Sequence, residues 1–67
     1  MNRAKLCGRI REKYGTQEAF AKALDMSPQT LSAKLHGKSD WTRVEIEMAG
    51  KKLEIPVAEI PDYFFAD

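Results

Sequence analysis

The first part of the chain has the periodicity of an amphipathic helix. Leu6, Cys7, Ile10 and Tyr14 fall at positions i, i+1, i+4 and i+8, so on a helix they form one apolar stripe among charged neighbours. Gly15 follows, and glycine ends helices because it adopts a left-handed backbone without steric cost. The pattern predicts a helix that ends at Tyr14, with Cys7 as a small core residue rather than a reactive thiol.

Two shorter helices are predicted next, separated by a turn. Thr16 can cap the first of them, whose inward face consists of Phe20, Ala21 and Leu24. Residues 25–27 interrupt the pattern. Ser27 and Pro28 then start another helix, because serine caps free N–H groups and proline at the first helical position loses no useful donor. This succession is the layout of a helix-turn-helix.

The helix after Pro28 has an apolar and a polar face. Leu31 and Leu35 lie one turn apart, Met26 is spaced to pack on Leu31, and Gly37 ends the helix. With about 100° of rotation per residue, Leu31 and Leu35 point inward. The opposite face then has Gln29 and Ala33 at its centre and Thr30, Ser32 and His36 at its flanks.

A capping box from Thr42 to Glu45 predicts a further helix. Trp41 and Ile46, which flank this segment, have the spacing of a hydrophobic staple. Its inward stripe is predicted to be Ile46, Ala49 and Leu53, with Gly50 as a modest weakness. Pro56 ends it. Residues 57–65 are predicted to form one or two short helical turns, split at Pro61.

These elements predict an all-α protein, a compact bundle of four to five short helices containing the helix-turn-helix. At 67 residues and 7.6 kDa the chain is expected to be one domain, residues 1–67, whose small core needs efficient packing or a partner subunit. The single cysteine excludes an intramolecular disulfide, and neither a signal peptide nor the roughly 20 apolar residues of a membrane span is found. A cytoplasmic protein is expected.

Charge is distributed unevenly although the net charge is only +1. Residues 1–38 contain eight Lys or Arg and three acids, which gives +5, whereas residues 39–67 contain three and seven, which gives −4. The basic half suits an anionic partner such as DNA, although small proteins also segregate charge by chance.

Catalysis is not indicated by any motif. No nucleophile and base pair, glycine-rich phosphate loop or paired carboxylates can be assembled, so we expect no enzyme and no small-molecule substrate. His36 is the single histidine and Cys7 the single cysteine, so neither a metal nor another cofactor is expected, and His36 suits a helix end better than a ligand role.

The segment from Gln17 to Lys38 resembles the phage lambda repressor and Cro family of helix-turn-helix domains. Gln17 opens the first helix of the pair, Ala21 is the small residue at the helix crossing, and Leu24 and Leu31 are core anchors. The stretch from Trp41 to Leu53 also resembles the fourth helix of phage-type members, so the resemblance covers most of the chain. Asp25 departs from the family, which usually has glycine in the turn, and Lys34 stands where many members have an apolar residue.

The resemblance implies DNA recognition by the second helix of the pair. Its exposed face enters the major groove, where Gln29 can bond to adenine, the Ala33 methyl can touch thymine, and Ser32 and Thr30 can bond to base edges or phosphates. When the phosphate-contacting positions of the family are carried over to this sequence, they fall on Gln17 and Lys38. Additional phosphate contacts are expected from Lys22, Lys34 and Arg43. Gln29 and Ser32 can also be ordinary solvated residues.

The sequence therefore suggests a sequence-specific double-stranded-DNA-binding transcriptional regulator, a phage or prophage repressor or Cro-like protein that occupies an operator. Such proteins usually bind as homodimers, and an apolar C-terminal surface is a candidate dimer surface, formed by Val44, Met48, Tyr63, Phe64 and Phe65. These aromatic residues can equally complete the monomer core. The alternative function is a protein-interaction module, such as an antirepressor or antitoxin, that uses this surface.

Overall fold

Helices and their connections make up the structure, a computed structural model that describes residues 1–66. The elements are α1 (Arg3–Tyr14), α2 (Gln17–Ala23), α3 (Pro28–Leu35), α4 (Arg43–Lys52), the 3-10 turn η1 (Val57–Glu59) and α5 (Ile60–Phe64). No strand occurs in this range. The predicted small all-α bundle is confirmed.

The helices begin at the predicted signals, and α1 and α3 end at them, whereas α4 ends at Lys52, before the predicted stop at Pro56. The side chains of Thr16, Ser27 and Thr42 each accept a hydrogen bond from the backbone N–H three residues later, at 3.1 Å in all three cases. Gly15 and Gly37 follow α1 and α3 with φ of 83° and 76°, the left-handed conformation that glycine adopts without strain. Local hydrogen-bonding groups thus define the helix boundaries.

The core consists of the predicted inward faces. Phe20, Leu31 and Leu53 are fully buried, as are other members of the stripes on α1 to α4, namely Leu6, Ile10, Ala21, Leu35 and Ala49. Tyr14 is half-buried and its ring lies 5.2 Å from that of Phe20. The four residues between α2 and α3 include Asp25 at φ 57°, so aspartate does occupy the left-handed position expected for glycine.

Most of the aromatic C-terminus belongs to this core. Tyr63 is 8% and Phe64 6% exposed, and Phe64 packs edge-on against Trp41 with ring centroids 5.2 Å apart. The backbone N–H of Asn2 also donates to the carbonyl of Tyr63, at 3.0 Å. Of the two roles left open for these residues, Tyr63 and Phe64 therefore have the second: their rings complete the small core and do not form a dimer surface, whereas Phe65 is exposed.

Two local interpretations of the C-terminal region also need correction. Pro61 does not split the tail but lies in the first turn of α5, where its missing N–H costs no helical hydrogen bond. Gly50 is more than a weak point of α4. A Cβ at Gly50 would lie 2.6 Å from Cδ1 of Ile60, so glycine permits the close approach of α4 and α5.

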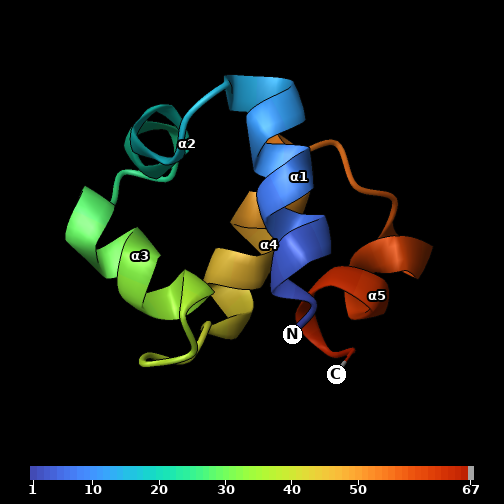
Figure 1. The fold of residues 1–67 in the computed structure, drawn as a ribbon. Helices are drawn as coiled ribbons and strands as arrows, with labels where there is room; N and C mark the ends of the chain where they lie inside the picture. The colour runs from blue at the N-terminus through green and yellow to red at the C-terminus, as the bar shows by residue number, and fades with distance from the viewer. Residues whose placement is uncertain (67) are drawn as a thin grey trace.

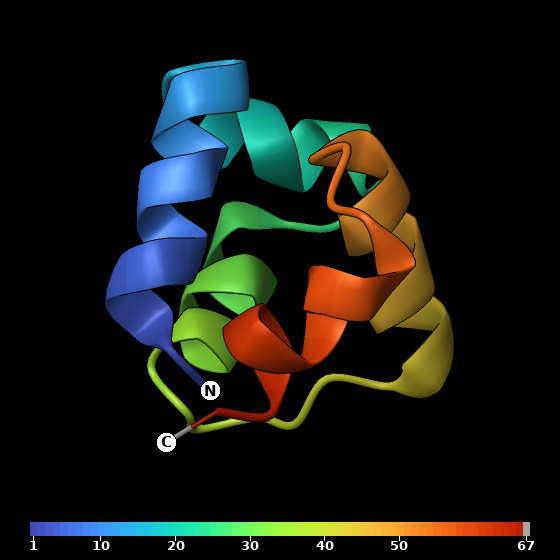
Figure 2. The same cartoon turned by 90° about the vertical axis from the view of Figure 1, so that its right-hand side faces the viewer.

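Two pairs of elements lie on opposite sides of the molecule. Helices α2 and α3 lie on one side, and η1 and α5 lie on the other (Figures 1 and 2). The N-terminus and the end of the described chain lie near each other. Arg9 of α1 holds the end of α4, because its Nε donates to the carbonyl of Leu53 at 2.9 Å.

Within the described residues, no helix is long and apolar enough to cross a membrane.

Candidate nucleic-acid interface

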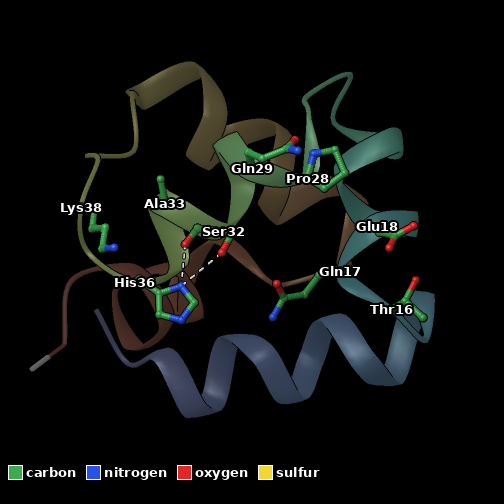
Figure 3. Close-up of a pocket in the computed structure, with 9 residues that line it drawn as sticks. All are labelled: Thr16, Gln17, Glu18, Pro28, Gln29, Ser32, Ala33, His36 and Lys38. Atoms are coloured by element: carbon green, nitrogen blue, oxygen red, sulfur yellow. Dashed lines mark hydrogen bonds between the residues drawn. The ribbon is translucent and has the colours of Figure 1, made fainter.

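An open depression lies where the start of α2 meets the exposed face of α3 (Figure 3). Its volume is about 640 Å³. It is lined by Thr16, Gln17, Glu18, Pro28, Gln29, Ser32, Ala33, His36 and Lys38. Seven of these nine residues have polar or charged side chains, so the depression offers hydrogen-bonding groups to a partner.

Five of the nine predicted DNA-contacting residues meet in this depression, namely Gln17, Gln29, Ser32, Ala33 and Lys38. Gln29, Gln17 and Lys38 are exposed, whereas Ser32 and Ala33 are half-buried. In Figure 3, Gln17 extends from α2 in the direction of His36 on α3. Residues 57–66 do not line the depression, so the described part of the C-terminal tail leaves the polar face of α3 uncovered.

His36 and Ser32 form a pair on this face. Nδ1 of His36 lies 2.8 Å from the carbonyl oxygen of Ser32 and 3.4 Å from its hydroxyl oxygen (Figure 3). A carbonyl only accepts hydrogen bonds, so Nδ1 carries the proton. In the neutral ring Nε2 is then an acceptor, and this nitrogen is not used by a partner among the described residues.

Thr30 lies outside the depression. Its hydroxyl accepts a hydrogen bond from Oγ of Ser27 at 2.8 Å, and its backbone N–H donates to the same oxygen at 3.1 Å. Thr30 is exposed, but its position supports the start of α3 rather than its central face. The structure therefore separates Thr30 from the other three predicted base-contacting residues.

Cations lie beside the depression on two sides. Lys22 lines a neighbouring hollow that shares Glu18 and Pro28 with the depression. Arg11 of α1 lines another, which shares Thr16 and Gln17. The sequence analysis did not single out Arg11, because only the packing of α1 on α2 brings it beside Gln17.

Lys34 is not available for a phosphate, so this prediction was wrong. Its side chain is only 6% exposed, and Nζ lies 2.8 Å from Oε1 of Glu45 and 2.8 Å from the carbonyl oxygen of Asp40. Many members of the resembled family have an apolar residue at this core position. Lys34 is tolerated there because Glu45 and the carbonyl of Asp40 bind its ammonium group. It thereby joins α3 to the capping box of α4.

Arg43 is not brought to the depression either. Its side chain is 92% exposed on α4 and pairs with Glu47 at 3.3 Å. An exposed pair of this kind adds little stability. The structure gives Arg43 no place beside the polar face of α3.

Two carboxyl groups titrate below the ordinary range. The hydrogen bond from Lys34 lowers the pKa of Glu45, and the N–H of Thr42, which donates to Oε1 at 2.8 Å, lowers it further. The hydrogen bond from Lys13 lowers the pKa of Glu54, which is exposed. Both anions lie in the acidic half of the chain, and neither lines the depression.

Metal chemistry has no support in the described residues, where no group of three or more His, Cys, Asp or Glu side chains is positioned to hold an ion. On one face of α3 the site combines the amide of Gln29, the hydroxyl of Ser32, the methyl of Ala33 and the imidazole of His36, with the amide of Gln17 beside them on α2. Such groups can form hydrogen bonds and van der Waals contacts with base edges.

The chain belongs to a protein family described as "Protein of unknown function (DUF739)", whose sequence model matches residues 2–67. A search of curated proteins finds no match for this chain.

Proposed function

We propose that this member of the DUF739 family is a sequence-specific DNA-binding regulator that occupies an operator through the exposed face of α3. The observation that supports this most directly is that Gln29, Ser32 and Ala33 line the same open depression as Gln17 and Lys38. Side chains able to contact bases and side chains able to contact phosphates thus face the same way. DNA recognition requires this combination.

The dimensions of α3 fit the major groove. An α-helix with its side chains is about 10 to 12 Å across, and the groove is about 12 Å wide, so a helix such as α3 can enter it. Leu31 and Leu35 hold its inner face in the core. The outer face then carries short or polar side chains, which allow the helix backbone to approach the base edges closely.

Each side chain of the face has a distinct role in the proposal. Gln29 at the second position of α3 donates to and accepts from an adenine edge, and the Ala33 methyl contacts the methyl group of thymine. His36 and Ser32 extend the same face by one turn. The neutral imidazole accepts a hydrogen bond at Nε2, which suits the exocyclic amino group of cytosine or adenine.

Phosphate contacts come from the margin of the depression. Lys38, Lys22 and Arg11 surround it on different elements, and the Gln17 amide can donate to a phosphate oxygen. Glu18 also lies at this margin and would repel a phosphate placed beside it, so we place the backbone nearer to Lys38 and Arg11.

Selection from random duplexes tests the proposal. The full chain is expected to enrich a consensus sequence from a pool of random double-stranded DNA. Titrations of the consensus against scrambled duplex, at several salt concentrations, then give the specificity ratio, which we expect to be at least about a thousandfold. Failure to enrich any consensus, with equal weak binding to all duplexes, would refute the proposal.

The Gln29→Ala variant tests the reading face. We expect it to lose about 1 to 3 kcal/mol of binding free energy on the consensus site and to keep its affinity for scrambled duplex. Circular dichroism of the variant controls for folding. Equal losses on both duplexes would contradict a base contact by Gln29.

A protein-interaction module, such as an antirepressor or antitoxin, is the second candidate. The observation that favours it is the exposure of Val44 and Val57, at 63% and 88%. These residues belong to α4 and η1, and neither lines the depression. Absence of binding to every duplex, together with capture of a specific protein that these two residues control, would favour this candidate over DNA binding.

A further inference from the structure

The imidazole of His36 is anchored at the C-terminal end of α3. Its Nδ1 lies 2.8 Å from the carbonyl oxygen of Ser32, one helical turn earlier. The same carbonyl also accepts the backbone N–H of His36, at 3.0 Å. A carbonyl oxygen has two lone pairs and no proton, so His36 donates both hydrogen bonds. The ring is thus held through Nδ1, and the other ring nitrogen is Nε2.

Nε2 of His36 remains available to a partner. His36 is exposed and lines the depression together with Gln29 and Ala33. Both hydrogen bonds of the ring in Figure 3 run from Nδ1 to Ser32. No hydrogen bond within residues 1–66 uses Nε2. A polar group that enters the depression can therefore bond to this nitrogen.

Protonation changes what Nε2 can bond without releasing the ring. In the neutral ring Nδ1 carries the proton, so Nε2 only accepts hydrogen bonds. In the cation both nitrogens carry protons, so Nδ1 still donates to Ser32 and Nε2 becomes a donor. The anchoring bond is the same in both states, whereas the atom offered to a partner changes from acceptor to donor.

The charged and titratable side chains around His36 belong to α1, to α2 and to the turns before and after α3. They line the depression or the two hollows that adjoin it, and they are Cys7, Arg11, Glu18, Lys22, Asp25 and Lys38. The imidazole forms no hydrogen bond with any of them. Of these side-chain types, only imidazole ordinarily changes its charge between about pH 5.5 and 7.5. His36, the single histidine of the chain, is therefore the group of this site that responds to pH in that range.

The two protonation states suit different bases. In the major groove, cytosine and adenine present exocyclic amino groups that donate hydrogen bonds, whereas guanine presents O6 and N7, which only accept. The neutral ring can accept from cytosine or adenine at Nε2. The charged ring can donate to guanine, and a hydrogen bond from a cation is roughly twice as strong as a neutral one. The charged ring and the amino group of cytosine are both donors and cannot bond to each other.

We propose that His36 determines base specificity according to its protonation state: near neutral pH it selects cytosine or adenine, and in acid it selects guanine at the same position. This inference rests on the proposed function, because it requires α3 to contact base edges. It assigns one base pair of the operator to His36 and makes that base pair depend on pH. Gln29 and Ala33 have no titratable side chain, so the bases that they contact should not change.

The tautomer of His36 can be measured in the free protein. Nitrogen-15 NMR of the imidazole distinguishes the two neutral tautomers in the full chain without DNA, at about pH 8.5, where imidazole is uncharged. We expect the proton on Nδ1 and none on Nε2. A neutral ring protonated at Nε2 would overturn the proposal, whatever DNA the protein binds.

Selection from random duplexes at two pH values tests the change of base. The full chain is expected to enrich cytosine or adenine at one position at about pH 7.5 and guanine there at about pH 5.5. Titration of the two duplexes at each pH should show a preference of about three- to tenfold for the matching one. His36→Gln is the control, because an amide both donates and accepts at either pH, so its consensus should not depend on pH. Circular dichroism controls for the fold of this variant.

The results distinguish failure of this inference from failure of the proposed function. A consensus that is the same at both pH values, or that changes equally in His36→Gln, would overturn the inference and leave operator binding in place. A uniform gain of affinity for every duplex at the lower pH would also overturn it, since the charged ring would then contact a phosphate. Absence of a consensus at either pH would overturn both.

Discussion

Lys34 shows how a charged residue can occupy a core position in a small protein. Its side chain is only 6% exposed, while Nζ reaches a carboxylate and a carbonyl at 2.8 Å each. Every unpaired charge in the interior costs free energy, so this lysine requires both partners. The pair also connects the helix proposed to contact bases with the cap of α4.

Lys34→Met is expected to lower the free energy of unfolding by about 1 to 3 kcal/mol, because Glu45 loses its partner and the Asp40 carbonyl loses its donor. This loss of unfolding free energy is smaller than for a deeply buried ion pair, because a quarter of the Glu45 side chain is exposed. Urea denaturation measures it. In the control Arg43→Ala, which removes an exposed pair, stability should change by at most about 0.5 kcal/mol. Similar effects of both variants would argue against the buried pair.

Glu45 makes part of the stability depend on pH. Its pKa is lowered in the folded protein, so its contribution is fully present above the ordinary glutamate pKa and is lost as the pH falls through the lowered value. In Glu45→Gln the amide oxygen can still accept from Thr42, but no charge remains. The stability difference between wild type and this variant should therefore be largest near neutral pH and shrink in acid. A difference independent of pH would exclude the charge as its cause.

At the scale of elements, the contact between α4 and α5 depends on one missing side chain. Gly50 is buried within α4, a position where alanine favours the helix by about 1 kcal/mol. The close approach of Ile60 offsets part of this preference, because its terminal methyl has to turn away from a new Cβ. Helix propensity and helix packing thus act in opposite directions at this residue.

Gly50→Ala is expected to stabilise less than the roughly 1 kcal/mol that helix propensity alone predicts, because Cδ1 of Ile60 must move to make room. Gly8→Ala is the matched control, since Gly8 lies within α1 with open space around its Cα, and we expect this change to stabilise by about 0.5 to 1 kcal/mol. Thermal melts compare the two. Equal stabilisation by both substitutions would show that Ile60 adjusts without cost.

For the whole molecule, uneven charge matters more than net charge. Arg9, Lys13 and Lys34 of the basic half are paired with carboxylates, which leaves fewer cations for a partner than the count of eight suggests. Lys38, Lys22 and Arg11 form no ion pair among the described residues and lie at or beside the depression. Three of the five cations of the basic half that form no ion pair in the described residues therefore lie at or beside the depression, and the other two, Arg3 and Lys5, lie at the start of α1.

Salt dependence of DNA binding tests this orientation. Lys38→Ala and Arg11→Ala should each weaken binding to all duplexes and reduce the slope of log K against log salt by about 1. Lys5→Ala is the control, because Nζ of Lys5 lies 4.7 Å from the ring centroid of Tyr63 on the α5 side. An equal reduction of the slope by all three variants would show that the contact is not confined to the α2–α3 side.

Amino-acid sequence alone determined the helices and their ends, because caps, glycine stops and apolar stripes act within about one or two turns of the chain. For the same reason it identified the polar face of α3. Tertiary structure alone decided the burial of Tyr63 and Phe64, the ion pair of Lys34 with Glu45, and the place of Arg11 beside Gln17. These features depend on how distant helices pack against one another, and no local spacing in the sequence encodes that contact.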